Sequence, residues 1–313
     1  MKPNLIILTG PTAVGKSALS VKLAEALNGE IISADSMQVY RGMDIGSAKI
    51  TKEEQKGIPH YLIDELKPCE EFNVVLFQKL AKFYLKQIYE KGKVPIIVGG
   101  TGFYIQSVLY DIDFEETEQE TDYRKELQEL AQKKGNEFLH EMLQKVDPKA
   151  AEQIHANNSK RVIRALEYHH LTGQPISEHN EQEREKEAAY NACYFVLNDE
   201  REKIYDRINL RIDEMLKDGL IQEVQILKEQ GCTKDMVSMQ GLGYKEILAY
   251  LNGECTLEEA VYILKRDTRH FAKRQLTWFK RERDVIWINK QEFGYNENMI
   301  LERMLSLIEE KFQ

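Results

Sequence analysis

The chain has 313 residues, of which 42% are hydrophobic and 30% charged, and its formal net charge at pH 7 is −9. This length and composition predict a folded protein of two domains, or of one large domain with an insertion, and exclude a disordered chain. No stretch approaches the roughly 20 apolar residues that span a bilayer, and the N-terminus lacks a signal peptide. We therefore expect a cytosolic protein without a membrane segment, and nothing in the sequence demands more than a monomer.

The N-terminal third alternates short apolar runs with amphipathic helical patterns. Continuous apolar runs are typical of parallel strands buried on both faces. Strands and helices in alternation predict right-handed βαβ units and a doubly wound parallel sheet. The expected strands are 5–8, 30–34, 61–64 and 94–98, and the expected helices are 17–27 and 72–89.

The pattern changes after Asp113. Residues 115–189 are polar and mostly helical in pattern, so we expect a small all-helical insertion domain flanked by mobile loops; the segment 178–187 is almost wholly hydrophilic. The core domain would then comprise residues 1–114 and 190–313. In its second part, apolar runs at 193–197 and 285–288 predict strands, and 201–229 and 257–280 predict helical stretches.

A phosphate-binding motif follows the first expected strand and opens the first expected helix. The sequence G-x-x-x-x-G-K-[ST] is matched in full. The glycines allow backbone N–H groups to surround a phosphate, the lysine supplies a positive charge, and the serine hydroxyl can hold Mg²⁺. The alternative is a tight glycine turn with an incidental lysine. The phosphate loop consists of Gly10, Pro11, Thr12, Ala13, Val14, Gly15, Lys16 and Ser17.

Two further loops are expected at the same edge of the sheet, where the carboxyl ends of parallel strands form the ligand crevice. Asp35 follows the second strand, where a carboxylate can act as a general base or reach Mg²⁺ through water; by position alone it is equally a turn residue. Residues 99–104 follow the strand 94–98, and three glycines there permit a close backbone approach to a ligand, with Thr101 offering a hydroxyl. A plain glycine turn is the alternative.

The chain is acidic as a whole, which counts against a general nucleic-acid binder. Residues 265–283, however, hold eight basic and two acidic residues, interleaved with aromatic ones. Cations beside aromatic side chains are typical of a nucleic-acid-binding face, although the aromatic residues could equally form the buried side of a helix. Arg207 with Arg211, and Arg161 with Arg164, have spacings that put each pair near one helix face. Both pairs could simply belong to solvated helix faces.

These blocks together resemble the tRNA dimethylallyltransferases, also called tRNA isopentenyltransferases. The resemblance runs in order from the first strand to about Arg283. It is carried by the phosphate loop, by the block DSMQVYRGMDIGSAK at 35–49, by PHYLID at 59–64, by GGTGFY at 99–104, by N-x-x-R-x-x-RALE at 158–167, by R-x-x-x-R at 207–211, by QGLGYKE at 240–246 and by KRQLTW at 273–278. The blocks 35–49 and 273–278 are the most specific.

The resemblance implies a P-loop NTPase-like doubly wound sheet with the helical insertion serving tRNA binding. It also implies transfer of a dimethylallyl group from dimethylallyl diphosphate to N6 of the adenosine at tRNA position 37, next to the anticodon, with release of diphosphate. The phosphate loop would hold the diphosphate, Lys16, Thr101 and Arg211 would stabilise its charge, and Ser17 would hold Mg²⁺. Asp35 would be the base on the adenine amine. The implied tRNA contacts are Asp35, Ser36, Met37, Gln38, Thr101, Arg161, Arg164, Gly241, Lys273 and Arg274.

Two other functions are compatible with the phosphate loop alone. Most such loops bind ATP or GTP, so a small-molecule kinase that uses ATP is the first alternative. A nucleotide-dependent RNA-binding module without catalysis is the second. Leu62, Ile63, Asp64 and Glu65 form an apolar run followed by acidic residues, as a hydrolytic ATPase requires, but this run is short and we interpret Asp64 as a structural residue.

Overall fold

The structure, a computed structural model, describes residues 2–114 and 122–313. The chain divides into two compact units. The larger unit comprises Met1–Asp111 and Ala188–Gln313, and the smaller unit comprises Ile112–Glu187. Residue 115, the expected start of the insertion, lies outside the described residues.

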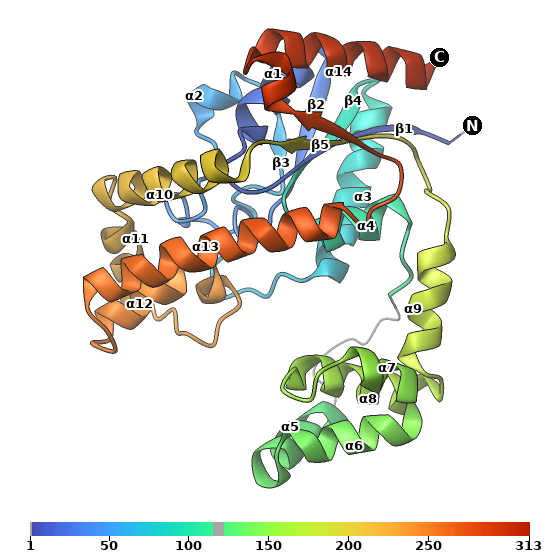
Figure 1. The fold of residues 1–313 in the computed structure, drawn as a ribbon, viewed down its shortest axis with the longest axis vertical. Helices are drawn as coiled ribbons and strands as arrows, with labels where there is room; N and C mark the ends of the chain where they lie inside the picture. The colour runs from blue at the N-terminus through green and yellow to red at the C-terminus, as the bar shows by residue number, and fades with distance from the viewer. Residues whose placement is uncertain (1, 115–121) are drawn as a thin grey trace. The chain divides into compact units, whose positions relative to one another are not determined.

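A six-stranded, all-parallel sheet forms the centre of the larger unit (Figure 1). The strand order is β3-β2-β4-β1-β5-β6. β1 lies between β4 and β5, with Ile7 opposite Ile97 on one side and Tyr194 on the other. The expected doubly wound parallel sheet is thus confirmed. The strands are β1 (Asn4–Thr9), β2 (Gly29–Ala34), β3 (His60–Tyr61), β4 (Val94–Gly99), β5 (Asn191–Asn198) and β6 (Val285–Asn289).

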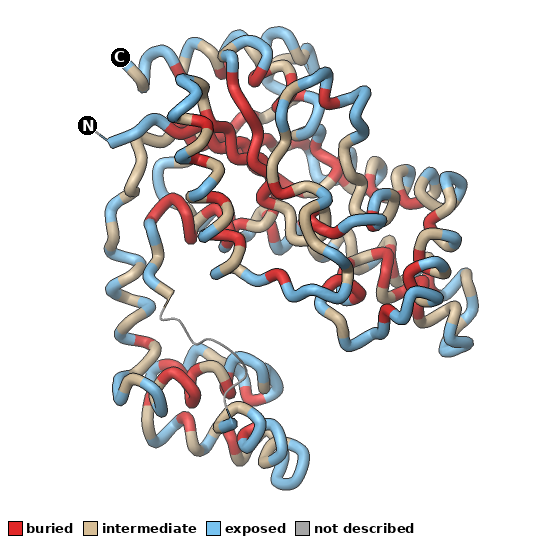
Figure 2. Tube along the Cα trace, turned by 180° about the vertical axis from the view of Figure 1, so that it is seen from behind, coloured by how far each residue is buried: buried red, intermediate tan, exposed pale blue. Residues whose placement is uncertain are grey.

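Helices cover both faces of this sheet, which is why its strands are apolar throughout. Leu5, Ile6, Ile7 and Leu8 are all fully buried, and because side chains alternate along a strand, both faces must be covered. On one face α1 (Lys16–Leu27) packs with α14 (Glu297–Phe312), and their apolar side chains share one core with alternate residues of β1. On the other face lie α3 (Val74–Glu90) and α4 (Gly102–Leu109). Figure 2 shows the buried residues concentrated in the strands and the helix sides that face them.

Two expectations for the larger unit are wrong in detail. The strand expected at 61–64 ends at Tyr61, because Leu62 and Asp64 have φ angles of 61° and 57°, which no strand accommodates. The helical stretch expected at 201–229 is two helices, since Gly219 has a φ of 106° and turns the chain between them. The helices of this region are α10 (Arg201–Lys217), α11 (Leu220–Glu229), α12 (Tyr244–Leu251) and α13 (Leu257–Phe279), with short helices α2 (Lys52–Gln55), η1 (Ser238–Gln240) and η2 (Lys290–Phe293) elsewhere in the unit.

The smaller unit is helical over its described residues and has a hydrophobic core of its own. Leu127, Leu139, Leu143 and Val162 are fully buried in that core. Asp147 ties the helices together, because its carboxylate accepts hydrogen bonds from the backbone N–H of Ala150 at 2.9 Å and from the hydroxyl and N–H of Ser177 at 2.7 and 2.9 Å. The helices are α5 (Asp122–Lys134), α6 (Asn136–Val146), α7 (Pro148–Gln153), α8 (Ser159–Thr172) and α9 (Ile176–Glu185).

The hydrophilic segment 178–187, where a flanking loop was expected, is therefore mostly helix. Its composition gives little apolar periodicity, and the helix is anchored by Ser177, whose contacts to Asp147 only the folded structure shows. None of the helices among residues 2–114 and 122–313 has the length and apolar character needed to cross a membrane.

Candidate active site

The phosphate loop lies at the carboxyl end of β1, between the ends of β4 and β5. Gly10 has a φ of 143°, and a Cβ on this residue would lie 2.2 Å from the carbonyl oxygen of Leu197 in β5. Gly15, with a φ of 99°, leads into α1. The close approach requires glycine at position 10, and the positive φ favours glycine at position 15, so the geometry of the loop accounts for both motif glycines.

Lys16 lies inside the loop, where the charges of two other side chains act on its amine. Its amine donates hydrogen bonds to the carbonyl oxygens of Gly10 at 3.0 Å and Pro11 at 2.8 Å. Burial, helped by the positive charge of Arg211 and opposed by the negative charge of Asp35, lowers the pKa of Lys16 to about 7. The charges of residues from α10 and from the end of β2 thus act on an amine at the start of α1.

Arg211 is a second cation at this place, and its environment is also unusual. Burial lowers the pKa of its guanidinium, Glu214 opposes this shift, and Arg207 adds to it. Within the described part of the chain it forms no ion pair at 4 Å or less. Two neighbouring, desolvated cations repel each other, and a bound polyanion would relieve that repulsion. The arrangement is therefore suited to a diphosphate or triphosphate.

Arg207, one helical turn earlier, has a supporting position. Its Nε donates to the carbonyl oxygen of Ala13 at 2.8 Å, and its Nη2 lies 2.7 Å from the buried carboxylate of Asp199. Ala13 has a φ of 60°, a conformation rare for residues other than glycine. Arg207 therefore holds the phosphate loop in a strained shape and is itself held by Asp199.

Asp35 begins the second loop (residues 35–49) directly after β2. Its Oδ1 accepts hydrogen bonds from the backbone N–H groups of Met37 at 2.8 Å and Gln38 at 3.3 Å. Among the described residues none donates a hydrogen bond to its Oδ2. One oxygen thus fixes the carboxylate and the other can accept a proton. The turn interpretation and the base interpretation of Asp35 are compatible, because the turn orients the carboxylate.

The rest of the second loop is held by charged and polar contacts. The amine of Lys49 lies 2.5 Å from Asp44 and 2.6 Å from Asp64, so Asp64 is a structural residue, as interpreted from the sequence. Glu223 of α11 accepts hydrogen bonds from the N–H groups of three consecutive residues, 44–46, at 2.8 to 3.0 Å, and from the hydroxyl of Tyr244 at 2.8 Å. These contacts hold the second loop in a fixed conformation beside the phosphate loop.

Two of the predicted tRNA contacts have partners inside the protein. The amide of Gln38 donates to the carbonyl oxygens of Ser47 at 3.4 Å and Ala48 at 3.3 Å. Gly241 is buried, and a Cβ there would lie 2.5 Å from the sulfur of Met37. Both residues therefore help to shape the second loop. Ser36 and Met37 are half-buried beside them.

The third loop (residues 99–104) lies against α13. Thr101 precedes α4, its N–H donates to the carbonyl oxygen of Ala34 at 3.2 Å, and its hydroxyl makes no capping hydrogen bond. A Cβ on Gly102 would lie 2.3 Å from the indole of Trp278. This loop therefore joins the end of β2 to the basic helix.

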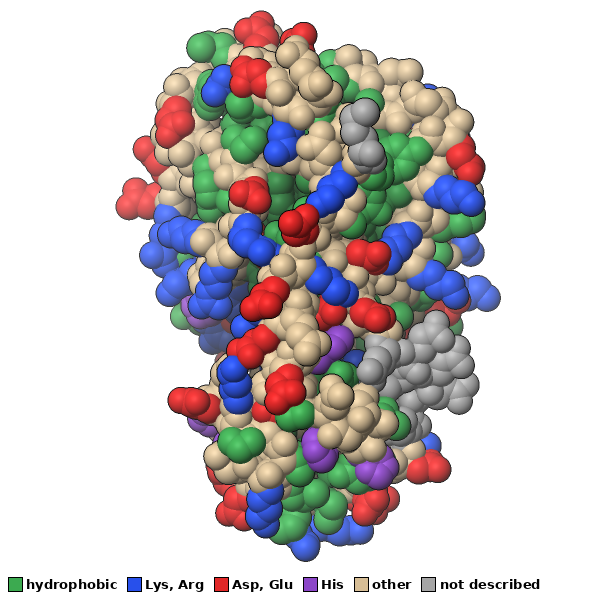
Figure 3. Space-filling view, turned by 90° about the vertical axis from the view of Figure 1, so that its right-hand side faces the viewer, with side chains coloured by type: hydrophobic (Ala, Val, Ile, Leu, Met, Phe, Trp, Pro, Cys, Tyr) green, Lys and Arg blue, Asp and Glu red, His purple; other side chains and the backbone are tan. Residues whose placement is uncertain are grey.

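The outer face of α13 is a stripe of cations. A hollow of about 400 Å³ is lined by residues at helical spacing on this face: His270, Lys273, Arg274, Thr277, Trp278 and Arg281. Lys273 and Arg274 are exposed, whereas Ala272, Gln275 and Phe279 on the opposite side are buried. Figure 3 shows Lys and Arg side chains gathered along one edge of the larger unit. Of the aromatic residues of this helix, Phe279 is part of the core and Trp278 borders the hollow.

Ser17, the last residue of the phosphate loop, is exposed in the first turn of α1. Two predicted residues lie outside the larger unit. Arg161 and Arg164 belong to α8 of the smaller unit; Arg161 is exposed, and Arg164 lies 3.9 Å from the buried Glu167.

Sequence analysis missed two supporting residues. Asp199 and Glu200 follow the apolar run of β5 after one asparagine, Asn198, so this segment resembles the apolar run with acidic residues at 62–65. No sequence pattern distinguishes Glu223, because a glutamate in an amphipathic helix is common and its partners lie far away in the chain.

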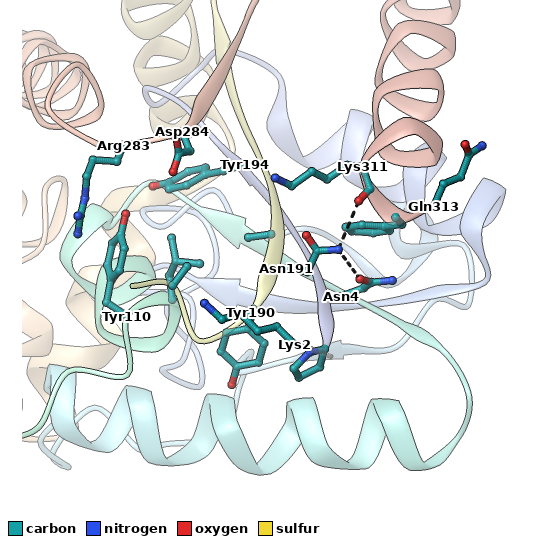
Figure 4. Close-up of a pocket in the computed structure, with 15 residues that line it drawn as sticks. Lys2, Asn4, Tyr110, Tyr190, Asn191, Tyr194, Arg283, Asp284, Lys311 and Gln313 are labelled. Carbon is teal, nitrogen blue, oxygen red and sulfur yellow. Dashed lines mark hydrogen bonds between the residues drawn. The ribbon is translucent and has the colours of Figure 1, made fainter. Parts of the chain in front are cut away.

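A larger cavity, of about 720 Å³, lies at the opposite edge of the sheet (Figure 4). Its lining includes Asn4 and Asn191, the first residues of β1 and β5, whose side chains are joined by a hydrogen bond of 2.8 Å. Ligands of open α/β sheets bind at the carboxyl ends of the strands. We therefore place the candidate site at the phosphate loop and not in this larger cavity.

The chain is similar to one family of known proteins over most of its length. A family model described as IPP transferase matches residues 38–282. The chain belongs to the IPP transferase family. A tRNA dimethylallyltransferase of Lachnoclostridium phytofermentans is 64% identical over 99% of both chains, and one of Acetivibrio thermocellus is 54% identical over 95% of both.

Solved structures of this IPP transferase family have the same fold. The tRNA isopentenylpyrophosphate transferase of Bacillus halodurans is 46% identical, with a TM-score of 0.73 over 99% of this chain and 98% of that one. A eukaryotic dimethylallyltransferase described as acting on tRNA is 30% identical, with a TM-score of 0.80 over 92% of this chain and 74% of that one. Membership of this family supports the resemblance stated from the sequence and leaves the kinase alternative without support.

Proposed function

We propose that the protein transfers a dimethylallyl group from dimethylallyl diphosphate to N6 of the adenosine next to the anticodon of tRNA. The observation that carries this proposal is a buried lysine of the phosphate loop, Lys16, on which the charges of Arg211 and Asp35 both act. Two cations suited to a leaving diphosphate stand beside one carboxylate suited to an amine proton. The names of the relatives support the same substrates.

The leaving group determines most of the chemistry. The allylic C–O bond breaks, and negative charge develops on the departing diphosphate, so the main task of the protein is to stabilise that charge. Lys16, Arg211 and the loop N–H groups would do so, with the hydroxyl of Thr101 at the rim. The hydroxyl of Ser17 would hold Mg²⁺, which neutralises diphosphate charge when bound.

The acceptor amine requires a base in a fixed position. The lone pair of N6 forms the new bond to the allylic carbon while the N–H proton passes to a neighbouring acceptor. Asp35 fits this role, since its Oδ1 is occupied by the N–H groups of Met37 and Gln38 while Oδ2 is free of protein donors within the described chain.

The RNA would be held mainly through its phosphates. An adenine stacked in the anticodon loop must be flipped out to reach a crevice at the strand ends. The cationic face of α13, with Lys273 and Arg274, is suited to the flanking backbone. Exposed Arg161 of the smaller unit offers a further phosphate contact, together with Arg164.

A transfer assay tests the proposal. Labelled dimethylallyl diphosphate and Mg²⁺ are incubated with the protein and tRNA, and γ-labelled ATP with the same components in parallel. We expect label to enter the tRNA from the allylic donor only, and to be lost when the adenosine next to the anticodon is replaced. Transfer from ATP to a small acceptor, without transfer from the allylic donor, would overturn it.

A further inference from the structure

Gln275 is a buried polar residue on the inner side of α13 that contacts two loops of the site. Its Oε1 accepts a hydrogen bond of 2.9 Å from the backbone N–H of Thr12 in the phosphate loop. Its Nε2 donates a hydrogen bond of 2.9 Å to the carbonyl oxygen of Gly100 in the third loop. The side chain is only 5% exposed. A single amide thus joins α13 to the loop expected to hold the donor.

The orientation of this amide follows from its partners. Thr12 offers an N–H donor and Gly100 a carbonyl acceptor, so only one placement of the amide oxygen and nitrogen satisfies both. Gly100 is matched to it, because a Cβ there would lie 2.1 Å from Nε2 of Gln275. Displacing the amide would leave the half-buried N–H of Thr12 and the buried carbonyl of Gly100 without this partner, which is costly.

The two sides of α13 would serve different ligands. Lys273 and Arg274, directly before Gln275 in the chain, are exposed on the cationic face, whereas Gln275 points inward to the phosphate loop. A helix is stiff over one turn, so a shift of its outer side on RNA binding moves its inner side as well. That movement reaches the backbone of Thr12 through one hydrogen bond.

We infer that Gln275 is a positioning residue that couples RNA binding on α13 to diphosphate binding in the phosphate loop. This inference rests on the proposed function. RNA bound along α13 fixes the helix, Gln275 then fixes Thr12 and Gly100, and the phosphate loop is held in its binding shape. By linkage, diphosphate in the loop strengthens RNA binding by the same factor.

Binding measurements without chemistry test the coupling. The affinity of inorganic pyrophosphate with Mg²⁺ is measured by titration calorimetry, with and without an excess of anticodon stem-loop RNA. For the native protein we expect RNA to increase pyrophosphate affinity by about fivefold or more, the usual range of coupling between sites. For Gln275→Met, which keeps the length of the side chain but removes both hydrogen bonds, we expect a ratio close to one.

Two more variants reach the same contact by other routes. Gln275→Glu retains the acceptor for Thr12 and removes the donor to Gly100, and Gly100→Ala displaces the amide while Gln275 remains. Both should reduce the ratio, and either can replace Gln275→Met if that variant does not fold.

Gln78→Met is the matched control: Gln78 of α3 is also buried, and it donates to the carbonyl oxygen of Ser107 in α4 at 2.7 Å. It should keep the native ratio.

Three results would overturn the inference: a native ratio of one, an unchanged ratio in the Gln275 and Gly100 variants, or an equal loss in Gln78→Met. Each is separable from failure of the proposed function, because the native protein is tested in parallel for dimethylallyl transfer to tRNA. Transfer without coupling removes only the role of Gln275.

Discussion

Lys16 and Arg211 place two positive charges together in a desolvated site, an arrangement that is unfavourable until an anion arrives. The protein meets this cost during folding, so the cations are already in position when the diphosphate binds. Preorganised charge of this kind stabilises a developing anion without reorganisation at the moment of reaction. The lowered pKa of Lys16 is the measurable sign of it.

The pKa of Lys16 predicts how diphosphate affinity depends on pH. In the free protein the amine is mostly charged below pH 7 and mostly neutral above it, since its pKa is about 7. A bound diphosphate favours the charged form, so binding above pH 7 requires proton uptake. Affinity for pyrophosphate should then fall by up to about tenfold per pH unit as the pH rises above 7.

Lys16→Arg provides the comparison, because arginine stays protonated throughout this range. The titration of pyrophosphate itself is common to both proteins and cancels in the ratio of their affinities. Calorimetry between pH 7 and 9 should show a steeper decline for the native protein than for Lys16→Arg. Parallel declines would mean that Lys16 is charged throughout.

Asp35→Asn tests the proposed base with little structural change. Asparagine can still accept the hydrogen bonds from Met37 and Gln38 through its amide oxygen, so the turn should persist. It cannot take a proton from N6, and we expect kcat to fall by about 10²- to 10⁴-fold with little change in tRNA affinity. Single-turnover assays and RNA-binding measurements check this; an unchanged rate would remove Asp35 from the mechanism.

At the residue scale, the sequence predicts site residues best where they belong to a local motif with a known chemical role. Lys16 and Asp35 follow from a complete motif and from their positions after strands. Gln275 does not, because its two partners lie 263 and 175 residues away along the chain. A buried glutamine between basic residues looks like part of a solvated helix until the other two loops are in place.

Among the elements, α13 allows the most specific prediction about tRNA binding, because its outer face is cationic. Lys273→Glu with Arg274→Glu should weaken tRNA binding and flatten its salt dependence. Each lost phosphate contact in a single-stranded loop reduces the slope of log affinity against log salt by about 0.7, so two contacts should change it by about 1.4. Filter binding at several salt concentrations measures the slope.

The control for this charge change is the pair Lys22→Glu with Lys56→Glu. Lys22 and Lys56 pair with Glu297 and Glu25 on the α1 side of the sheet, so the net charge changes equally at a different place. The control should keep the native slope. A native slope in the α13 variant instead would place the RNA interface elsewhere.

The strands are the elements that the sequence predicts most reliably. β1, β2, β4, β5 and β6 lie within a few residues of their expected positions, because continuous apolar runs have few other uses in a chain of this kind. The break at Gly219 and the helix α9 were missed for opposite reasons. One depends on a single backbone angle, and the other on the contacts of its first turn with Asp147.

For the whole molecule, the positions of the two ends of the smaller unit indicate that this unit can be deleted without disrupting the larger one. The N–H of Ala189 donates to the carbonyl oxygen of Leu109 at 2.8 Å, so the chain leaves and re-enters the larger unit at neighbouring points. Joining Asp111 to Ala188 through a short Gly-Ser linker should leave a folded core that binds pyrophosphate nearly as the full chain does. We expect tRNA affinity to fall by at least about tenfold, equivalent to about 1.4 kcal/mol.

Thermal unfolding, pyrophosphate calorimetry and RNA binding on the same preparation test this excision. A cooperative transition with native pyrophosphate affinity shows that the core is intact. If that intact core also bound tRNA as tightly as the full chain, the smaller unit would have no part in RNA binding.

Gly99, Gly100 and Gly102 have a consequence for how this family can vary over evolution. None of the three has a positive φ. Glycine is therefore needed at these positions because it has no Cβ, and not because of its backbone conformation. A Cβ on Gly99 would lie 2.2 Å from the backbone oxygen of Ala34, which no exchange of side chains can relieve, whereas Gly100 and Gly102 face the side chains of Gln275 and Trp278. Sequences that diverge here should therefore change positions 100 and 275 together, and 102 and 278 together, while position 99 stays glycine.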